Sequence, residues 1–265
     1  MAFLNYEYKM KIRYEENISK CYFTIKAIPA DDLRQKNISC EFTLTPPVTY
    51  SVNMDSFGNK QIYGSENMLH RDFEFHMKGL AETGTGIVCA AVNESRLGMY
   101  KYPFGKCIPG VCILGFADSL TRLVNEKKTA YEKALLIMGA LYEKIAYESG
   151  STDVETTAEE AFAAGRGVCQ DYAHILISLL RIFHIPARYV CGLVVGEGKS
   201  HAWVEAACDG SFIGLDPTSN RVINEEYIKL GVGRDASDCA INRGIMWGGG
   251  RQSQEIEVVV KKFCQ

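Results

Sequence analysis

The hydrophobic periodicity of this chain changes twice along its length, which limits the folds that it can adopt. In the first third, apolar and polar residues alternate, as in Phe73–Lys78, and this is typical of a strand with one wet face. Residues 129–148 and 169–183 instead carry apolar residues at helical spacing, and alternation returns after them. We therefore predict an α+β fold. An N-terminal antiparallel β-domain is expected in residues 1–115, and helices packed on an antiparallel sheet in residues 116–265.

The individual elements follow from the same patterns and from the turn and cap residues between them. The expected strands are residues 7–14, 21–28, 38–44, 49–53, 73–78, 187–195, 201–207, 212–216 and 254–263. The expected helices are residues 129–148, 156–164 and 169–183. Thr157 and Glu160 stand at the spacing of a capping box, and Pro186 ends the last helix.

The composition of the 265 residues excludes several classes of protein. With 47% hydrophobic and 23% charged residues, the chain is neither disordered nor fibrous. Its formal net charge of −3, with Lys and Arg spread out, gives no basic field for nucleic acid or an anionic membrane. No apolar run is long enough to span a bilayer, and the first residues lack the apolar region of a secretory signal. We therefore expect a cytoplasmic protein with neither nucleic-acid nor membrane partners; the oligomeric state stays open.

Ten cysteines are scattered along the chain without a Cys-x-x-Cys pair, and no histidine stands at zinc-finger spacing. In a cytosol such thiols stay reduced, and most of them are expected to be small buried hydrophobic groups. Gly248-Gly249-Gly250 lacks the Lys-Ser/Thr of a phosphate-binding loop and is expected to be a mobile loop. The sequence thus predicts neither a metal site nor a cofactor.

Cys169 begins a predicted helix, directly after Gly165-Arg166-Gly167-Val168. A thiol at a helix N-terminus lies near the positive end of the dipole and near free amides, which favour the reactive thiolate and stabilise an oxyanion. Gly167 lets a substrate approach the backbone closely, and Gln170 and Tyr172 add polar groups, so all three are candidate substrate-binding residues. The alternative is a buried structural cysteine, because the helix carries an apolar stripe.

Asp209-Gly210 lies between two alternating runs, which is a strong signal for a β-hairpin. As a two-residue turn it places Val204 opposite Leu215 and Ala206 opposite Ile213. This register gathers one coherent apolar face, and a slip of one residue would disrupt it.

The other face of this hairpin carries His201, Trp203 and Asp216. Asp216 is diagonal to His201, and diagonal neighbours on one face lie within reach of each other. Taken separately, His201 is also explained as an exposed strand end, Asp216 as a turn residue before Pro217, and Trp203 as either a substrate-contacting cleft wall or core. Together with Cys169 they fit the nucleophile, base and orienting carboxylate of thiol catalysis.

Other titratable side chains near this candidate site are expected to have structural roles. His174 lies too far around the helix to serve Cys169 as a base, so we expect it to pack or to form a hydrogen bond. Asp171 in the first turn and His184 at the end of the helix are expected to be charges that the helix dipole favours.

Four segments of the chain carry a family resemblance: Gly165-Arg166-Gly167-Val168-Cys169-Gln170-Asp171-Tyr172-Ala173-His174, Ile185-Pro186-Ala187-Arg188-Tyr189-Val190, His201-Ala202-Trp203-Val204-Glu205 and Leu215-Asp216-Pro217-Thr218. In this order and spacing they resemble the transglutaminase-like core in its bacterial form. A weaker resemblance extends to the turn at Met54–Asn59 and to a segment that begins at Tyr227 and includes Arg243.

The resemblance implies a papain-like core in which Cys169 is the nucleophile, His201 the base and Asp216 the orienting carboxylate. It implies thiol-dependent acyl chemistry on an amide or peptide substrate, without a cofactor. Hydrolysis by a cysteine peptidase or amidase is favoured, because the chain lacks the acidic cluster of a calcium-regulated cross-linker. The alternatives are protein-glutamine acyl transfer, as in a transglutaminase, and a catalytically idle binding module.

Three departures from the family pattern concern the far rim of the cleft. His184 stands where the family usually has glycine, Ala236 replaces an aromatic residue, and Ala240-Ile241 replaces a Pro-Pro pair. These differences bear on the choice of substrate and leave the three predicted catalytic residues intact.

Overall fold

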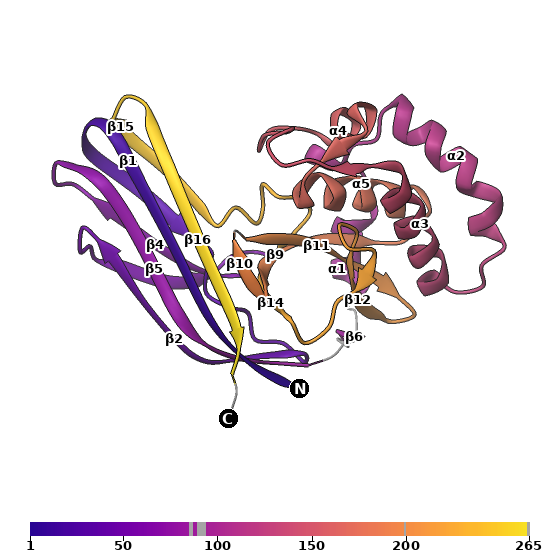
Figure 1. Ribbon diagram of the computed structural model, residues 1–265, viewed down its shortest axis with the longest axis horizontal. Helices are drawn as coiled ribbons and strands as arrows, with labels where there is room; N and C mark the ends of the chain where they lie inside the picture. Colours follow the sequence, from indigo (N-terminus) through magenta and orange to yellow (C-terminus); the bar gives the residue numbers. More distant parts are fainter. Residues whose placement is uncertain (85–86, 89–93, 199, 264–265) are drawn as a thin grey trace.

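The computed structural model describes residues 1–84, 87–88, 94–198 and 200–263, and two antiparallel sheets dominate it (Figure 1). The first sheet has eight strands: β1 (Ala2–Ile25), β2 (Gln35–Thr45), β3 (Tyr50–Met54), β4 (Lys60–Glu66), β5 (His70–Thr83), β10 (Gly196–Gly198), β15 (Asn242–Gly248) and β16 (Gln252–Lys262). The second has six: β6 (Ile87–Val88), β9 (Ala187–Val194), β11 (His201–Cys208), β12 (Ser211–Asp216), β13 (Arg221–Val222) and β14 (Tyr227–Gly233).

The helices belong to the half of the molecule that holds the second sheet. They are α1 (Glu94–Lys101), the 3₁₀ helix η1 (Gly105–Cys107), α2 (Val111–Asn125), α3 (Ala130–Lys144), α4 (Ala158–Ala164) and α5 (Cys169–Ile182). Helices α2 to α5 gather over one face of the second sheet (Figure 1), where their apolar stripes share a core with Val204, Ala206 and Leu215. Two short parallel strands, β7 (Ala146–Tyr147) and β8 (Arg166–Gly167), precede α4 and α5. The α+β fold, with helices on an antiparallel sheet, is confirmed. No helix in the described ranges is long and apolar enough to cross a membrane.

The first sheet is built around β1, a strand of 24 residues. β16 pairs with its first half and β15 with its second half, both antiparallel. Between them Gly248, Gly249 and Gly250 have φ values of 90°, 94° and 61°, which residues with a side chain rarely adopt. The ribbon folds over at this bend, so that Phe23 of the second half lies 5.0 Å from Phe73 of β5 between ring centroids. The sheet thus encloses its own core, and the glycine run forms the bend.

The two sheets do not separate at the predicted boundary between residues 115 and 116. Strands β15 and β16, which the sequence analysis placed with the second domain, pair along β1 and complete the first sheet. Residues 242–262 thus contribute strands to the first sheet. The reason is a pairing between the two ends of the chain, which no local pattern reveals.

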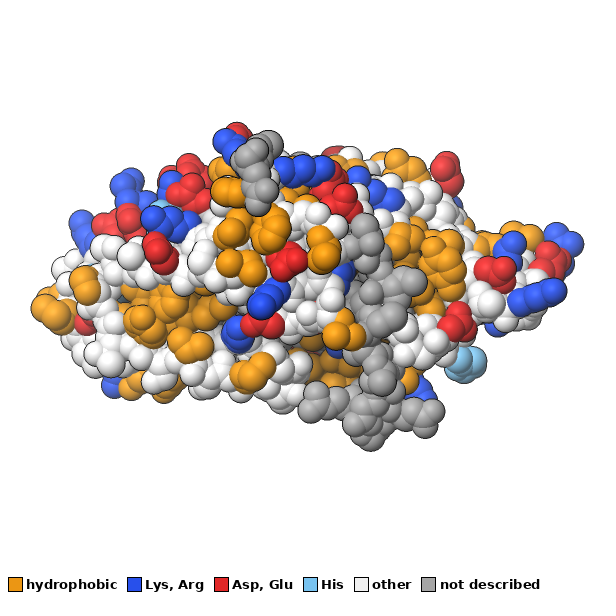
Figure 2. All heavy atoms as spheres, turned by 90° about the horizontal axis from the view of Figure 1, so that it is seen from below, with side chains coloured by type: hydrophobic (Ala, Val, Ile, Leu, Met, Phe, Trp, Pro, Cys, Tyr) orange, Lys and Arg blue, Asp and Glu red, His pale blue; other side chains and the backbone are white. Residues whose placement is uncertain are grey.

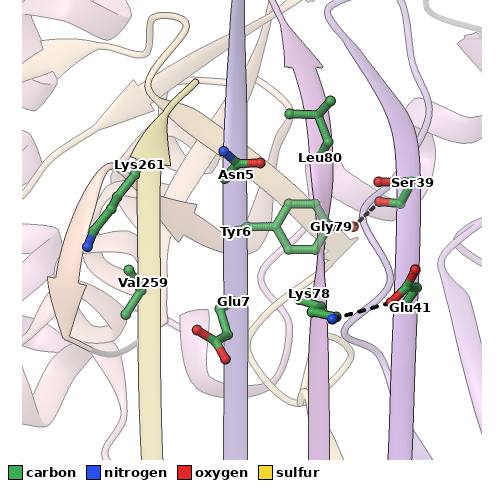
Figure 3. A pocket seen from close by; sticks show the side chains of 10 residues that line it. All are labelled: Asn5, Tyr6, Glu7, Ser39, Glu41, Lys78, Gly79, Leu80, Val259 and Lys261. Atoms are coloured by element: carbon green, nitrogen blue, oxygen red, sulfur yellow. Dashed lines mark hydrogen bonds and ion pairs between the residues drawn. The ribbon is translucent and has the colours of Figure 1, made fainter. Parts of the chain in front are cut away.

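A tight crossing of side chain over backbone packs the first sheet. The Tyr6 ring extends from β1 across Gly79 of β5, and its hydroxyl donates to the carbonyl of Ser39 on β2 at 2.9 Å (Figure 3). A Cβ atom at position 79 would lie 2.1 Å from that carbonyl oxygen and 2.3 Å from the Tyr6 hydroxyl. Glycine at position 79 is therefore required by close approach.

The residues at the helix ends explain why α4 could be predicted from the sequence and why α2 could not. The Thr157–Glu160 capping box of α4 is present as predicted. Helix α2 was not predicted, and it has no cap within its own segment. Its first backbone amides donate instead to Glu159 of α4, from Gly110 at 2.9 Å and from Cys112 at 2.7 Å. His184, which follows α5, has a φ of 59°, the left-handed conformation that explains why glycine is usual there.

The turn at residues 55–59 joins the two halves of the molecule. Asp55 accepts hydrogen bonds from the backbone amides of Phe57 and Asn59, and its other oxygen accepts from Lys26 Nζ at 2.8 Å. Asn59 is buried; it donates to the carbonyl of Val232 on β14 at 2.8 Å and accepts from the amide of Val232 at 2.7 Å. The side-chain amide thereby replaces a strand partner for β14.

A buried charge network forms a second junction. Glu205 on β11 accepts from Arg188 Nε at 2.7 Å and from Lys229 Nζ at 2.9 Å, and Lys229 also pairs with Asp32 in the loop before β2. Burial alone would raise the pKa of Glu205, but these two cations lower it to about 2. Gln35 of β2 exchanges hydrogen bonds with the backbone of Lys229 at 2.7 and 2.9 Å. The two halves are therefore held by polar contacts at defined positions.

We predict that Asn59→Ala destabilises the protein by about 2 kcal/mol, because the buried amide and carbonyl of Val232 lose their partners. The free energy of unfolding, measured with urea, tests this. Asn53→Ala on the exposed strand β3 serves as the control and should leave stability unchanged. Equal stability of the two variants would contradict the role of the turn as a junction.

Candidate active site

Cys169 is the first residue of α5, and the loop before it is fixed by Asp171. The buried Asp171 carboxylate accepts from the backbone amide of Val168 at 2.8 Å and from Thr152 Oγ1 at 2.6 Å. Burial raises the pKa of Asp171 against the opposing effect of these hydrogen bonds. A Cβ at Gly167 would lie 2.7 Å from the Cβ of Asp171. Asp171 therefore anchors the turn that presents the thiol at the helix end.

The hairpin that carries the other two predicted catalytic residues has the predicted register. β11 and β12 pair Val204 with Leu215 and Ala206 with Ile213. His201 and Asp216 lie on the face away from the helices, and His201 Nε2 is 3.0 Å from Asp216 Oδ2. The diagonal contact expected between the imidazole and the carboxylate is thus present.

The Asp216 carboxylate is buried and held by four hydrogen-bond donors. Oδ2 accepts from His201, from the Tyr227 hydroxyl at 2.8 Å and from Ser219 Oγ at 3.0 Å, while Oδ1 accepts from the amide of Thr218 at 3.0 Å. Burial alone would raise the pKa of Asp216, but the hydrogen bonds and the charge of His201 outweigh it and lower the pKa. The group is therefore a fixed anion at neutral pH.

The imidazole of His201 lies between this anion and the thiol. Burial would lower its pKa, but hydrogen bonds to Asp216 and to the Cys169 side chain, with the charges of both groups, raise it to about 9. The site thus places His201 3.0 Å from Asp216 and close enough to Cys169 for the thiol to act on its pKa. This arrangement can hold a proton on the imidazole while the sulfur acts as a nucleophile.

Tyr227 of β14 extends the site beyond the three predicted residues. Its buried hydroxyl donates to Asp216 and accepts from Arg221 Nε at 2.8 Å. The sequence analysis singled out Tyr227 only as part of a family-like segment, because a tyrosine in an apolar strand carries no local sign of a polar role. The topology gives Tyr227 its polar role. β14 lies beside β9, and from there the Tyr227 side chain reaches Asp216 on the hairpin.

A cavity of about 420 Å³ opens beside the site. Gln170 and Ser200, the neighbours in sequence of Cys169 and His201, line it. The opposite wall comes from the first sheet, through Tyr8 and Ile256. The cavity therefore lies between the two halves of the molecule, with the thiol end of α5 at its border. Within the described part of the chain, no three His, Cys, Asp or Glu side chains gather as a metal site would require.

Residues 118–217 match the family model of the Transglutaminase-like superfamily. This segment of the chain is therefore a transglutaminase-like domain. It contains Cys169, His201 and Asp216. An uncharacterised protein of Mycobacterium leprae is 42% identical over 128 residues, which are 44% of this chain and 45% of that protein, so the match spans less than half of that relative. An uncharacterised protein of Mycobacterium tuberculosis is 26% identical over 91% of this chain and 86% of its own length.

A solved structure shares the whole fold. It comes from Cytophaga hutchinsonii and is named as that of "a putative cysteine protease". It has a TM-score of 0.80 and 22% identity, over 100% of this chain and 91% of that one. This likeness establishes the fold that the transglutaminase-like chain adopts.

The four predicted substrate-binding residues of this transglutaminase-like protein differ in their surroundings. Trp203 is fully buried and packs edge-on against Tyr227 with ring centroids 5.4 Å apart, so it belongs to the core behind His201. Tyr172 is 2% exposed, and its hydroxyl donates to the carbonyl of Ile145. Gly167 is buried against Asp171, as described above. These three present no surface to a substrate, and Gln170 alone of the four lines the cavity.

His174 and Ala236, also singled out in the sequence, meet at the rim. His174 is buried, and its Nε2 accepts from the backbone amide of Ala236 at 3.1 Å. Burial lowers the pKa of His174 to about 4, so the ring is neutral and acts as a hydrogen-bond acceptor. The expected structural role of His174 agrees with this contact.

We predict that Asp216→Asn lowers the pKa of His201 clearly from about 9, because the burial remains while the neighbouring charge is lost. NMR titration of the imidazole measures this. In the wild type, the raised pKa stabilises the fold below about pH 6.5, and this contribution is lost as pH rises through about 9.

The control is Asp72→Asn, which removes an exposed carboxylate from β5 and should leave the titration of His201 unchanged. A pKa that stays near 9 in Asp216→Asn would show that the carboxylate is not the group that holds the proton on His201.

Proposed function

We propose that this protein is a thiol-dependent enzyme that cleaves amide bonds of peptide or protein substrates by hydrolysis. The observation that carries the proposal is the placement of His201 beside Asp216, 3.0 Å away, and close to Cys169, at the border of an open cavity. The transglutaminase-like domain agrees with acyl chemistry at a thiol. Hydrolysis, as opposed to transfer of the acyl group to an amine, is the specific part of the proposal.

The first half-reaction forms a thioester. The Cys169 sulfur, as thiolate, attacks the carbonyl carbon of the substrate amide and forms a tetrahedral intermediate. Backbone N–H groups of the first turn of α5 have no acceptor within the helix, so they can stabilise the oxyanion. The C–N bond then breaks, and the leaving amine takes the proton of the His201 imidazolium.

The second half-reaction releases the acid. His201, now neutral, takes a proton from water as the water oxygen attacks the thioester carbonyl. The C–S bond breaks, a carboxylic acid leaves, and the Cys169 thiolate and the His201 imidazolium are restored. Asp216 stays ionised throughout; it orients the ring and stabilises its positive charge.

Peptide amides in a defined library, incubated under reducing conditions with and without a primary amine, test this proposal by mass spectrometry. We expect cleavage or deamidation products, with little amine adduct. Cys169→Ala should abolish turnover, and Asp216→Asn should lower kcat by about 10² to 10⁴-fold, because the imidazole loses its preferred tautomer.

Cys112→Ala, which removes an exposed cysteine on α2, is the matched control and should retain wild-type turnover. Amine adducts as the main product would show that the protein transfers the acyl group to an amine and does not mainly hydrolyse the amide. Turnover that persists in Cys169→Ala, or no turnover in the wild type, would contradict the proposal and favour a binding module.

A further inference from the structure

The cavity beside the site continues away from the thiol as a longer groove. A second cavity, of about 260 Å³, lies between the folded-over halves of the first sheet. Asn242, Arg243 and Gln254 line both cavities, so the two adjoin. The groove thus begins at Gln170 and Ser200, beside the thiol and the imidazole, and runs into the open end of the first sheet.

The groove has an apolar floor throughout. Tyr8 and Tyr189 line its first part, and Phe23 and Phe73 line its second part. A groove of this length with apolar side chains in both parts suits an extended chain with several side chains better than a small molecule.

One wall of the groove is a strand edge without a partner. β16 pairs with β1 along its whole length, but on its other edge β10 covers Val258–Val260 alone. Among the described strands, none pairs with this edge at residues 252–257. Gln254 and Ile256, which line the groove, belong to this stretch. An unpaired edge offers backbone donors and acceptors to an extended peptide.

The charge of the groove is positive. Three charged side chains line it, Lys106, Glu155 and Arg243, and the first two pair at 3.2 Å. Arg243 is exposed, and the part of the chain that the structure describes provides its guanidinium with no hydrogen-bond or ion-pair partner. On the outer surface, by contrast, basic and acidic side chains lie interspersed, as Figure 2 shows for one face. A carboxylate is the group that a free guanidinium recognises best.

We propose that the groove binds an extended segment of the substrate polypeptide next to the scissile amide, with an Asp or Glu side chain of that segment at Arg243. The inference rests on the proposed function and adds the substrate class, an apolar peptide with an acidic residue. Arg243 is then a specificity-determining residue, distinct from the three predicted catalytic residues.

Fluorescence anisotropy with labelled peptides tests this in the Cys169→Ala protein, which binds without turnover. One apolar peptide is made in three forms, with Glu, Gln or Lys at the variable position. We expect the Glu form to bind at least about tenfold more tightly than the Gln form, and this preference should shrink as salt is added. Adding Arg243→Glu should abolish the preference for Glu and favour the Lys form.

Arg122→Glu in the same background is the matched control, because it makes the same charge change on α2, at the far end of the molecule (Figure 1). It should leave the preference unchanged. Loss of the preference in the control, its persistence in Arg243→Glu, or no binding of any of the three forms would overturn the proposal.

Turnover of the same peptides by the wild-type chain separates this proposal from the proposed function. Hydrolysis without a preference for Glu would contradict the proposed binding of an acidic residue at Arg243, and it would still support the proposed hydrolytic function. Binding with the expected preference but without hydrolysis would support the groove and contradict the proposed function.

Discussion

The contact between His201 and Asp216 is the interaction on which the account of this site depends. A buried carboxylate is unfavourable unless it is hydrogen-bonded or paired, and here four donors satisfy it, with the imidazole among them. The hairpin register decides whether this pairing exists, because a slip of one residue between the two strands would put the two side chains on opposite faces. Burial of Val204 and Leu215 against the helices therefore fixes a register that also builds the site.

The first sheet supplies one side of the cleft. Its long ribbon bends at Gly248–Gly250, so that the free edge of β16 meets the half that holds the second sheet, beside α5. The Asn59 turn and the buried Lys229 network hold this geometry from two points. A substrate that crosses the cleft would contact both halves, which gives a physical reason for a β-rich half that carries none of the three predicted catalytic residues.

The sequence was enough to predict the parts of the molecule that short-range rules determine. The turn at Asp209-Gly210 set the hairpin, and apolar spacing located α5 and the thiol at its start. The pairing of β15 and β16 with β1 was not predictable, because it joins the chain ends. The burial of Trp203 and the contact of Tyr227 with Asp216 were not predictable for a related reason: the side chain of Tyr227, on β14 of the same sheet, packs against the hairpin face that looked open. Substrate contacts depend on such long-range packing more than the catalytic groups do.

Selective alkylation of the thiols tests the central claim most directly. Iodoacetamide is applied across pH, and the rate at each cysteine is measured by mass spectrometry. If Cys169 is paired with the imidazolium of His201, it should react faster than the other cysteines below pH 7, since the thiolate is the reactive form. His201→Ala should slow that reaction to the rate of an ordinary exposed thiol. If Cys169 reacts at the same rate as the other thiols, or if its rate is unchanged in His201→Ala, the account is contradicted.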